Sequence, residues 1–469
     1  MASTHFHGGD SNNSYGRQDA PRVKELFPLP LTMQLLSGQI PAPLHRWLPA
    51  GLQPLGWFVA RSYCLLVIFS SLHLGLLFSK STLDALPTGQ LEDITDALTM
   101  AVIYFFTAYA TTYWFVRSQQ LLVYVQNIQS EYRHHSLAGV SFVSAYGAYR
   151  WARNFSVIWV SACLSGVTFW AITPLVVGSH TLPLSCWYPF DALAPGNYAS
   201  IYVTQLYAQI MVGSTFSSNG ALFVSLCVLL LAQYDVLYCS LKNLDAHASL
   251  LAGESLSGLR KLQLELLASP AASELQQYVF LEEHMTNLEV FASMQRLGVG
   301  EPAINMKTGL HMALVECVQL HRFIVDSCAE LERLFNPYCL VKSLQITIQL
   351  CLLVFVGVSG TRDVLRIINQ LQYLVLTLLE LFMFTFCGEL LRRHSVRAGD
   401  ALWRSNWWHH AHLIKTDVLI LLINSRRAVQ VTAGKFYVMD VNRLRLVVTQ
   451  AFSFLTLLQK LAAKKTLET

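Results

Sequence analysis

The side chains that could do chemistry in this sequence are few, and none stands in a pattern typical of an enzyme. His409, His410 and His412 form a cluster beside Trp407 and Trp408, and His-rich tracts can bind metal ions. No acidic or cysteine ligand follows at a fixed spacing, so a His- and Trp-rich inner patch is the favoured interpretation, with a metal site as the alternative. The sequence also lacks a P-loop, an H-E-x-x-H pair and a Gly-x-Ser-x-Gly elbow. We therefore expect no catalytic activity, no cofactor and no metal ion.

One carboxyl group, that of Glu380, lies in the middle of a long apolar segment. Ionisable groups inside a membrane-spanning helix are costly and often functional. Two interpretations stay open: the carboxyl group hydrogen-bonds a neighbouring helix, or it belongs to a ligand pocket or pathway. Lys342, Arg366 and Arg443 stand near segment ends, where we expect their long side chains to reach the membrane interface.

Aromatic and small polar residues gather in four of the apolar segments, mostly in the outer halves. A largely apolar cavity with a few polar groups is what a small-molecule site needs. Residue by residue, ordinary helix packing is the alternative. The residues that we expect to bind a ligand are Tyr104, Phe105, Ser165, Phe169, Trp170, Tyr207, Met211 and Tyr373.

The last apolar segment carries a thin polar line near its end. Thr456 and Gln459 are three residues apart, so they share one face of a helix. A symmetric ring of such helices would form a narrow pore with an apolar constriction. Taken alone, the pattern favours ordinary helix packing.

Seven long apolar segments must position these residues. Hydrophobic residues make up 53% of the 469-residue chain and charged residues 13%, against roughly a quarter charged in a soluble domain. A spanning helix needs about 20 apolar residues. We therefore expect an all-α membrane protein with seven transmembrane helices, near residues 57–79, 96–116, 156–178, 199–231, 338–360, 366–388 and 437–461.

The basic residues lie on one set of the connections between these segments. Connections 1–56, 117–155, 232–337 and 389–436 hold 23 Lys and Arg, whereas the other connections and the tail hold 4. Cytoplasmic loops carry such an excess, so we predict a cytoplasmic N-terminus and an extracellular C-terminus. This orientation is the reverse of that of a G-protein-coupled receptor. The net charge of +4 is spread over the inner loops, and we expect no nucleic-acid partner.

The same division predicts the domain organisation. Residues 1–56 form a cytoplasmic N-terminal segment, and we expect residues 26–56 to lie at the membrane interface and lead into the first helix. Residues 57–231 hold helices 1–4. Residues 232–337 and 389–436 form cytoplasmic helical regions on either side of helices 5 and 6 (338–388). An apolar stripe in the first region runs on into the fifth span at Asn336-Pro337 and packs either on the chain's own inner ends or on other subunits. The last span, 437–461, precedes an extracellular tail, 462–469.

Several motifs resemble signatures of the insect odorant receptors. Three of them occur in order near the C-terminus: Phe384-Thr-Phe-Cys-Gly-Glu-Leu-Leu391, Ala433-Gly-Lys-Phe436 and Phe454-Leu-Thr-Leu-Leu458. The outer-loop motif Leu182-Pro-Leu-Ser-Cys-Trp-Tyr-Pro189, followed by Tyr198 and Gln205, also resembles that family. The resemblance implies a ligand-gated, non-selective cation channel in the plasma membrane of olfactory sensory neurons. It implies tetramers held by a cytoplasmic anchor, an odorant pocket among helices two, three, four and six, and a pore lined by the last helix.

Carried onto this chain, the resemblance puts Thr456 and Gln459 at the pore and Leu457 near the gate. The family's co-receptor has an apolar branched residue where Thr456 stands, which favours a tuning subunit that forms a heterotetramer with the co-receptor. The expected partners are the co-receptor, a small volatile odorant and the lipid bilayer. The alternatives are a gustatory receptor channel of the same superfamily and a G-protein-coupled receptor, although the Asp-Arg-Tyr and Asn-Pro-x-x-Tyr motifs of the latter are absent.

Overall fold

The computed structural model describes residues 27–44, 48–87, 91–137, 141–178, 181–253, 257–258, 261, 264, 278–285, 305–358, 364–405 and 407–468. Within this part of the chain seven helices are long: α2 (Gln53–Ala85), α3 (Leu91–Glu131), α4 (Tyr146–Val177), α5 (Tyr198–Lys242), α9 (Met306–Val358), α10 (Val364–Ser395) and α13 (Val441–Glu468). They correspond in order to the seven expected spans.

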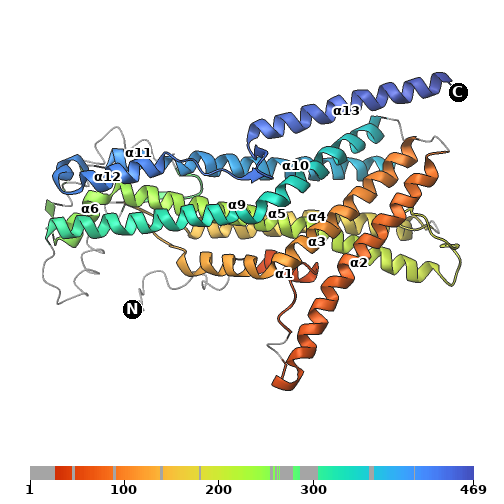
Figure 1. Cartoon of the computed structure of the whole chain (residues 1–469), viewed down its shortest axis with the longest axis horizontal. Helices are drawn as coiled ribbons and strands as arrows, with labels where there is room; N and C mark the ends of the chain where they lie inside the picture. The colour runs from red at the N-terminus through yellow and green to blue at the C-terminus, as the bar shows by residue number, and fades with distance from the viewer. Residues whose placement is uncertain are drawn as a thin grey trace.

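The remaining elements are short. They comprise the helices α1 (Pro28–Leu36), α6 (Leu244–Leu251), α11 (Arg397–Arg404) and α12 (Ala411–Ser425) and the 3-10 turns η3 (Ala50–Leu52) and η5 (Trp407–His410). Two antiparallel ladders pair β1 (Ser141–Val143) with β2 (Glu283–Met285) and β3 (Thr432–Ala433) with β4 (Tyr437–Val438). α6, α11 and α12 gather at one end of the elongated molecule, and the loop before α5 lies at the other (Figure 1).

Six helices in the described part are long and apolar enough to cross a membrane, namely α2, α3, α4, α5, α9 and α10. The predicted all-α membrane fold is therefore confirmed. α13 is not among the six. Its first turns carry Arg443 and Arg445, and many of its side chains lie outside the described residues. It runs unbroken through 462–468, the stretch that we expected to be a tail.

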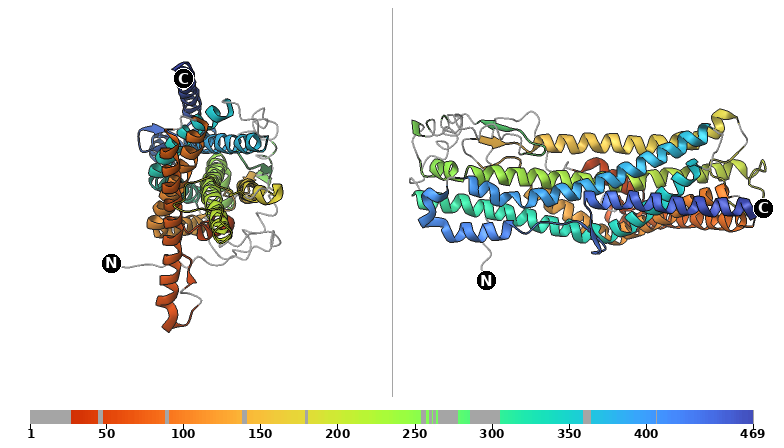
Figure 2. Two further views of the ribbon diagram at one scale, coloured as in Figure 1. Left: turned by 90° about the vertical axis from the view of Figure 1, so that its right-hand side faces the viewer. Right: turned by 90° about the horizontal axis from the view of Figure 1, so that it is seen from above.

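α5 forms the centre of the bundle. Its residues from Met211 to Leu241 are buried, apart from a half-buried Phe216, so neighbours must cover this helix on every side. α1, α4, α9, α10 and α11 do so (Figure 2). Small residues bring α4 close to α5, since a Cβ on Gly220 would lie 2.7 Å from Trp159 Nε1. Close approach through small residues is typical of helices packed in a membrane.

The segment before α2 packs into the helix bundle. α1 packs on α5, with Phe27 buried. The Gln34 side chain donates to Asn219 Oδ1 at 3.3 Å, and Gln39 Nε2 donates to Ser218 Oγ at 2.9 Å; all four polar residues are buried. Buried polar groups need such partners, and α5 supplies them at the height of its expected span.

α9 runs without a break from Met306 to Val358, as its apolar stripe predicts, and it contains Pro337. A proline has no N–H, so the carbonyl of Arg333 loses its helical donor. Two hydroxyl groups from α3 reach the same turn, where α9 changes direction (Figure 1). Tyr113 donates to the carbonyl of Leu334 at 2.5 Å, and Tyr109 donates to the carbonyl of Pro337 at 3.3 Å. These bonds fasten α3 to the bend of α9.

We expect Gly220→Ala to destabilise the protein by about 1–3 kcal/mol, because the new methyl group overpacks the α4–α5 contact. Thermal unfolding of the purified protein in detergent measures the effect. Gly51→Ala is the matched control, since a Cβ there meets nothing within 4 Å. Equal unfolding temperatures for the two variants would contradict the close approach of α4 and α5.

Candidate functional site

An apolar cluster joins the outer parts of α2, α3 and α5 to the loop before α5. We call it the outer cluster; its buried members are Leu74, Leu77, Phe78, Ala101, Ile103, Tyr104, Leu184, Ala208 and Val212. The ring of Tyr104 stacks on Phe78 with centroids 5.6 Å apart. The phenol group of Tyr104 lies within electrostatic range of Tyr373 on α10 and of Cys186 and Tyr188 in the loop. Four elements thus converge around Tyr104.

Residues 182–189 form a lid over the outer cluster, and one side chain of α5 holds it. Gln205 is fully buried. Its Nε2 donates to the carbonyl of Leu184 at 3.0 Å and to the hydroxyl of Tyr188 at 3.1 Å, while its Oε1 accepts from the backbone N–H of Leu184 at 3.0 Å. The side-chain amide of Gln205 thus bonds both the N–H and the carbonyl of Leu184, as a backbone peptide group of a neighbouring strand would. This contact gives a structural role to the outer-loop motif and to the glutamine that follows it.

Of the expected ligand residues, Tyr104 belongs to this cluster and Tyr373 lies near it. Tyr104 and Met211 are buried, and Trp170, Tyr207 and Tyr373 are half-buried. In the described part of the chain the Trp170 Nε1 is buried without a hydrogen-bond partner, whereas the Tyr207 hydroxyl faces that of Tyr63. An unpaired buried donor of this kind calls for an explanation, such as a water or a ligand.

The other three expected ligand residues point elsewhere. Ser165 is exposed and donates to the carbonyl of Ala162, and Phe169 is 45% exposed. Phe105 is 37% exposed and lines a separate groove of about 530 Å³ between α2 and α3. The structure thus does not bring these three side chains to the outer cluster.

Glu380 forms a buried ion pair with Lys342, so the expectation that Lys342 reaches the membrane interface is wrong. The Lys342 side chain is 2% exposed, and its Nζ lies 2.8 Å from Glu380 Oε2. The same ammonium lies over the rings of Phe216 at 3.8 Å and Phe106 at 4.6 Å. Ring faces attract a cation, so α3, α5 and α10 together hold the Lys342 side chain of α9 inside the bundle.

The hairpin before α13 is fastened to α9 at Asn336, one residue before Pro337. Asn336 Nδ2 donates to Thr432 Oγ1 at 2.6 Å, and the Asn336 carbonyl accepts from the N–H of Gly434 at 3.1 Å. Gly434 and Lys435 have positive φ angles of 61° and 60°. These angles, which favour glycine, explain the glycine of the Ala433–Phe436 motif.

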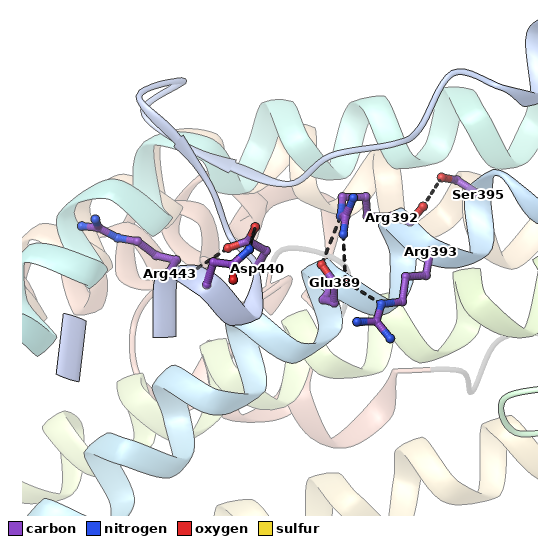
Figure 3. A network of polar contacts seen from close by, with 7 residues as sticks. Glu389, Arg392, Arg393, Ser395, Asp440 and Arg443 are labelled. Carbon is purple, nitrogen blue, oxygen red and sulfur yellow. Dashed lines mark hydrogen bonds and ion pairs between the residues drawn. The ribbon is translucent and has the colours of Figure 1, made fainter. Parts of the chain in front are cut away.

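Gly388 of α10 lies against the segment that leads into α13. A Cβ at Gly388 would lie 2.1 Å from the Met439 carbonyl oxygen, so only glycine allows this approach. Next to it, Arg392 and Arg393 both contact Glu389 (Figure 3). The hydrogen bond from Arg392 is the main reason that the pKa of Glu389 is lowered.

α13 begins at a cap and then packs on α9 and α10. Asp440 Oδ1 accepts from the N–H of Arg443 at 2.8 Å (Figure 3), where a carboxylate favours a helix start. Val447 and Ala451 are buried with residues of α9 and α10. Thr456 is exposed and donates to the carbonyl of Ser453 at 2.8 Å. Leu457 and Gln459 lie in α13, but their side chains are outside the described residues.

The histidine cluster lies at the inner end of the molecule. His410 Nε2 lies 2.8 Å from Asp245 Oδ1 and so joins η5 to α6. Among the described residues no group of three or more His, Cys, Asp or Glu side chains is placed to hold a metal ion. The contact gives His410 a structural role.

Asp235 lies in α5 beyond its expected span and holds a loop of the inner region. Its Oδ2 accepts from the backbone N–H of Val279 at 3.0 Å and from that of Phe280 at 3.5 Å. Burial raises the pKa of Asp235 to about 7, although both N–H groups and Arg397 favour the charged form. Sequence analysis gave no signal for this contact.

The fold is that of a multi-pass, all-α membrane protein. A family model described as 7tm Odorant receptor matches residues 90–452. The chain is 61% identical to putative odorant receptor 85e of Drosophila melanogaster over 99% of both chains. It is 20% identical to the odorant receptor coreceptor of Anopheles gambiae, over 56% of this chain and 59% of that protein. The chain belongs to the insect odorant receptor family.

A solved structure has the same fold. It is that of the olfactory receptor OR5 of Machilis hrabei in complex with eugenol. The TM-score is 0.66 at 12% identity, and the match covers 94% of this chain and 98% of that one. At this identity the likeness shows the fold alone.

We expect Gln205→Leu to loosen the lid, because Leu184 loses the partner of both its backbone groups. Hydrogen exchange of residues 182–189, followed by mass spectrometry, should become about tenfold faster, as the loss of about 1–2 kcal/mol implies. The control is Gln120→Leu, at an exposed position of α3. Unchanged exchange in the lid would contradict this role of Gln205.

The raised pKa of Asp235 predicts a pH dependence of stability. Because the folded protein binds the proton more tightly than the unfolded chain, this group destabilises the fold as pH rises from about 4 to about 7, and its effect is constant above that. Asp235→Asn should remove this slope, which unfolding temperatures at pH 5.5, 6.5 and 7.5 would show. Asp326→Asn, at an exposed residue of α9, should keep it.

Proposed function

We propose that this chain is a tuning subunit of an odorant-gated, non-selective cation channel in the plasma membrane of olfactory sensory neurons. The position of α13 carries the proposal. This helix packs on α9 and α10 through Val447 and Ala451 and leaves Phe452, Phe454 and Thr456 exposed. It lies along one side of the bundle (Figure 1). Copies of α13 around a common axis would cover these side chains and enclose a pore.

The inner region supports assembly into a heterotetramer with a co-receptor. A groove of about 970 Å³ lies between α9 and α12, and its wall includes Val315, Val318, Val325 and Ile420. These four side chains are exposed, whereas the stripe behind them is buried on the chain's own helices. On this proposal residues 232–337 and 389–436 form the cytoplasmic anchor, and an inner helix of a neighbouring subunit covers the groove.

The outer cluster and the residues around it would take a small, mostly apolar volatile. The lid held by Gln205 would exclude water from it. Trp170 Nε1 would supply a donor to a polar atom of the ligand. Such a site, apolar with a few polar groups, fits a volatile compound.

α10 is the element through which the ligand would act on the pore. It carries Tyr373 next to Tyr104, then Leu381 against α13, and then Gly388 against Met439. A ligand favours the open state only by binding it more tightly than the closed state. A ligand that binds better to one position of α10 would therefore shift α13 through these two contacts.

The direct test is to express this chain together with an insect odorant receptor co-receptor and to record currents over a broad panel of volatiles. We expect odorant-evoked cation currents that need both subunits. Currents from this chain alone would favour the homotetrameric arrangement of gustatory receptors. Silence over the whole panel, with both subunits at the cell surface, would contradict the proposal.

Thr456→Cys tests the pore. We expect a charged thiol reagent to reduce the odorant-evoked current strongly in this variant, because the modified side chain would obstruct a narrow pore. The wild type and Val176→Cys, at a 79% exposed position of α4, should keep their current under the same treatment. Equal sensitivity of both cysteine variants would argue against a pore at this face of α13.

A further inference from the structure

The Lys342–Glu380 pair belongs to a group of buried polar atoms from four helices. Gln34 of α1 contacts Asn219 of α5, which faces the hydroxyl of Tyr338 on α9; Tyr338 in turn lies within electrostatic range of Glu380. In the described part of the chain four atoms of this group are buried without a well-formed hydrogen bond: Gln34 Oε1, Asn219 Nδ2, Tyr338 OH and Glu380 Oε1.

These atoms are too costly to be left unsatisfied. An unpaired buried polar group costs about 1–3 kcal/mol, and more if it is charged. Lys342 Nζ lies 2.8 Å from Oε2 and over the rings of Phe216 and Phe106, whereas Oε1 of Glu380 has no hydrogen-bond partner among the described residues. Either waters or the polar group of a ligand must bind there.

The ion pair is adjacent to the outer cluster. Phe216 packs against that cluster and also lies 3.8 Å beneath the Lys342 ammonium, so it forms a wall common to both. On α10, Glu380 follows Tyr373 by seven residues, which puts the two side chains on one face about 10 Å apart. A small ligand whose apolar part contacts the outer cluster could thus place its polar end at the pair.

We propose that Lys342 and Glu380 bind the hydroxyl group of the ligand and make this receptor selective for alcohols and phenols. A hydroxyl group both donates and accepts hydrogen bonds. Its O–H would donate a hydrogen bond to Glu380 Oε1, and its oxygen would accept one from Lys342 Nζ. An ether or ester oxygen only accepts, so it leaves Oε1 unpaired. A charged ligand would leave a net charge in this buried site beside an already neutral ion pair, which is costly. This inference rests on the proposed function, because it names the ligand class of the same site.

The test compares each alcohol with its methyl ether on the channel formed with the co-receptor. 2-Phenylethanol with its methyl ether and hexan-1-ol with its methyl ether are suitable probes. The wild type should respond to an alcohol at concentrations at least tenfold below those of its ether, since sites that bond a hydroxyl group reject analogues without one.

The informative variant is Lys342→Met with Glu380→Met. It removes both charges at once, and replacing a buried ion pair by apolar residues of similar volume is often neutral for stability. We expect surface expression to persist, the half-maximal concentration for alcohols to rise at least tenfold, and that for ethers to stay unchanged. Glu380→Gln keeps an acceptor and should shift the alcohols less, which provides a second reading if the double variant fails to reach the surface.

The matched control is Lys80→Met with Asp84→Asn, which removes an exposed ion pair on α2 and should shift neither compound. If the Lys342 and Glu380 variants shift the half-maximal concentrations of alcohols and ethers equally, or shift neither, the inference is overturned and the proposed function stays intact. The same holds for a wild type that responds to the ethers and not to the alcohols. A wild type that responds to no volatile of either class or of the broad panel would contradict the proposed function itself.

Discussion

The bend of α9 at Asn336-Pro337 is the constraint on which the rest of the structure depends. Proline removes a helical hydrogen bond, and the backbone of that turn then bonds to other elements. Tyr109 and Tyr113 of α3 bond its carbonyl groups, while Asn336 bonds the hairpin before α13 through its side chain and its carbonyl. α3, which carries Tyr104, and the hairpin before α13, the proposed pore helix, therefore both meet α9 within about one turn of that helix.

This arrangement fixes the start of α13 through directional contacts. There the hairpin bonds to Asn336, Met439 lies against Gly388, and Asp440 caps the first turn. Each hydrogen bond contributes roughly 1 kcal/mol, and the contact at Gly388 leaves no room for a methyl group. Two to three turns farther along, Val447 and Ala451 of α13 pack in an apolar cluster with α9 and α10, and such packing is less directional. On the proposed mechanism, α13 would therefore tilt from its fixed start.

The sequence predicted the elements well because apolar length and periodicity report directly on helices. The stripe from Leu314 to Leu334 indicated that α9 continues through Pro337, and it does. α1 escaped prediction because Gln34 and Gln39 look like surface residues until Asn219 and Ser218, far along the chain, are seen beside them.

The individual contacts of the site were harder to predict than the helices. Lys342 stands near a segment end, where long basic side chains usually reach the interface. Its acidic partner is 38 residues away in the sequence, and its two aromatic neighbours come from two other helices, so no local pattern could show the pair. Gly388 was recognised only as part of a family motif, since the reason for it is the carbonyl oxygen of Met439.

The two interpretations of Glu380 turn out to concern different oxygens of one carboxylate. Oε2 bonds a neighbouring helix through Lys342, while Oε1 has no partner in the described part of the chain. Stability alone does not explain such a pair, because desolvating two charges offsets most of their attraction and apolar residues would serve as well. The pair does something that apolar residues cannot do: it presents a hydrogen-bond acceptor and donors beside an apolar cluster in the membrane. A site of that kind distinguishes ligands by one hydroxyl group, which apolar packing discriminates only weakly.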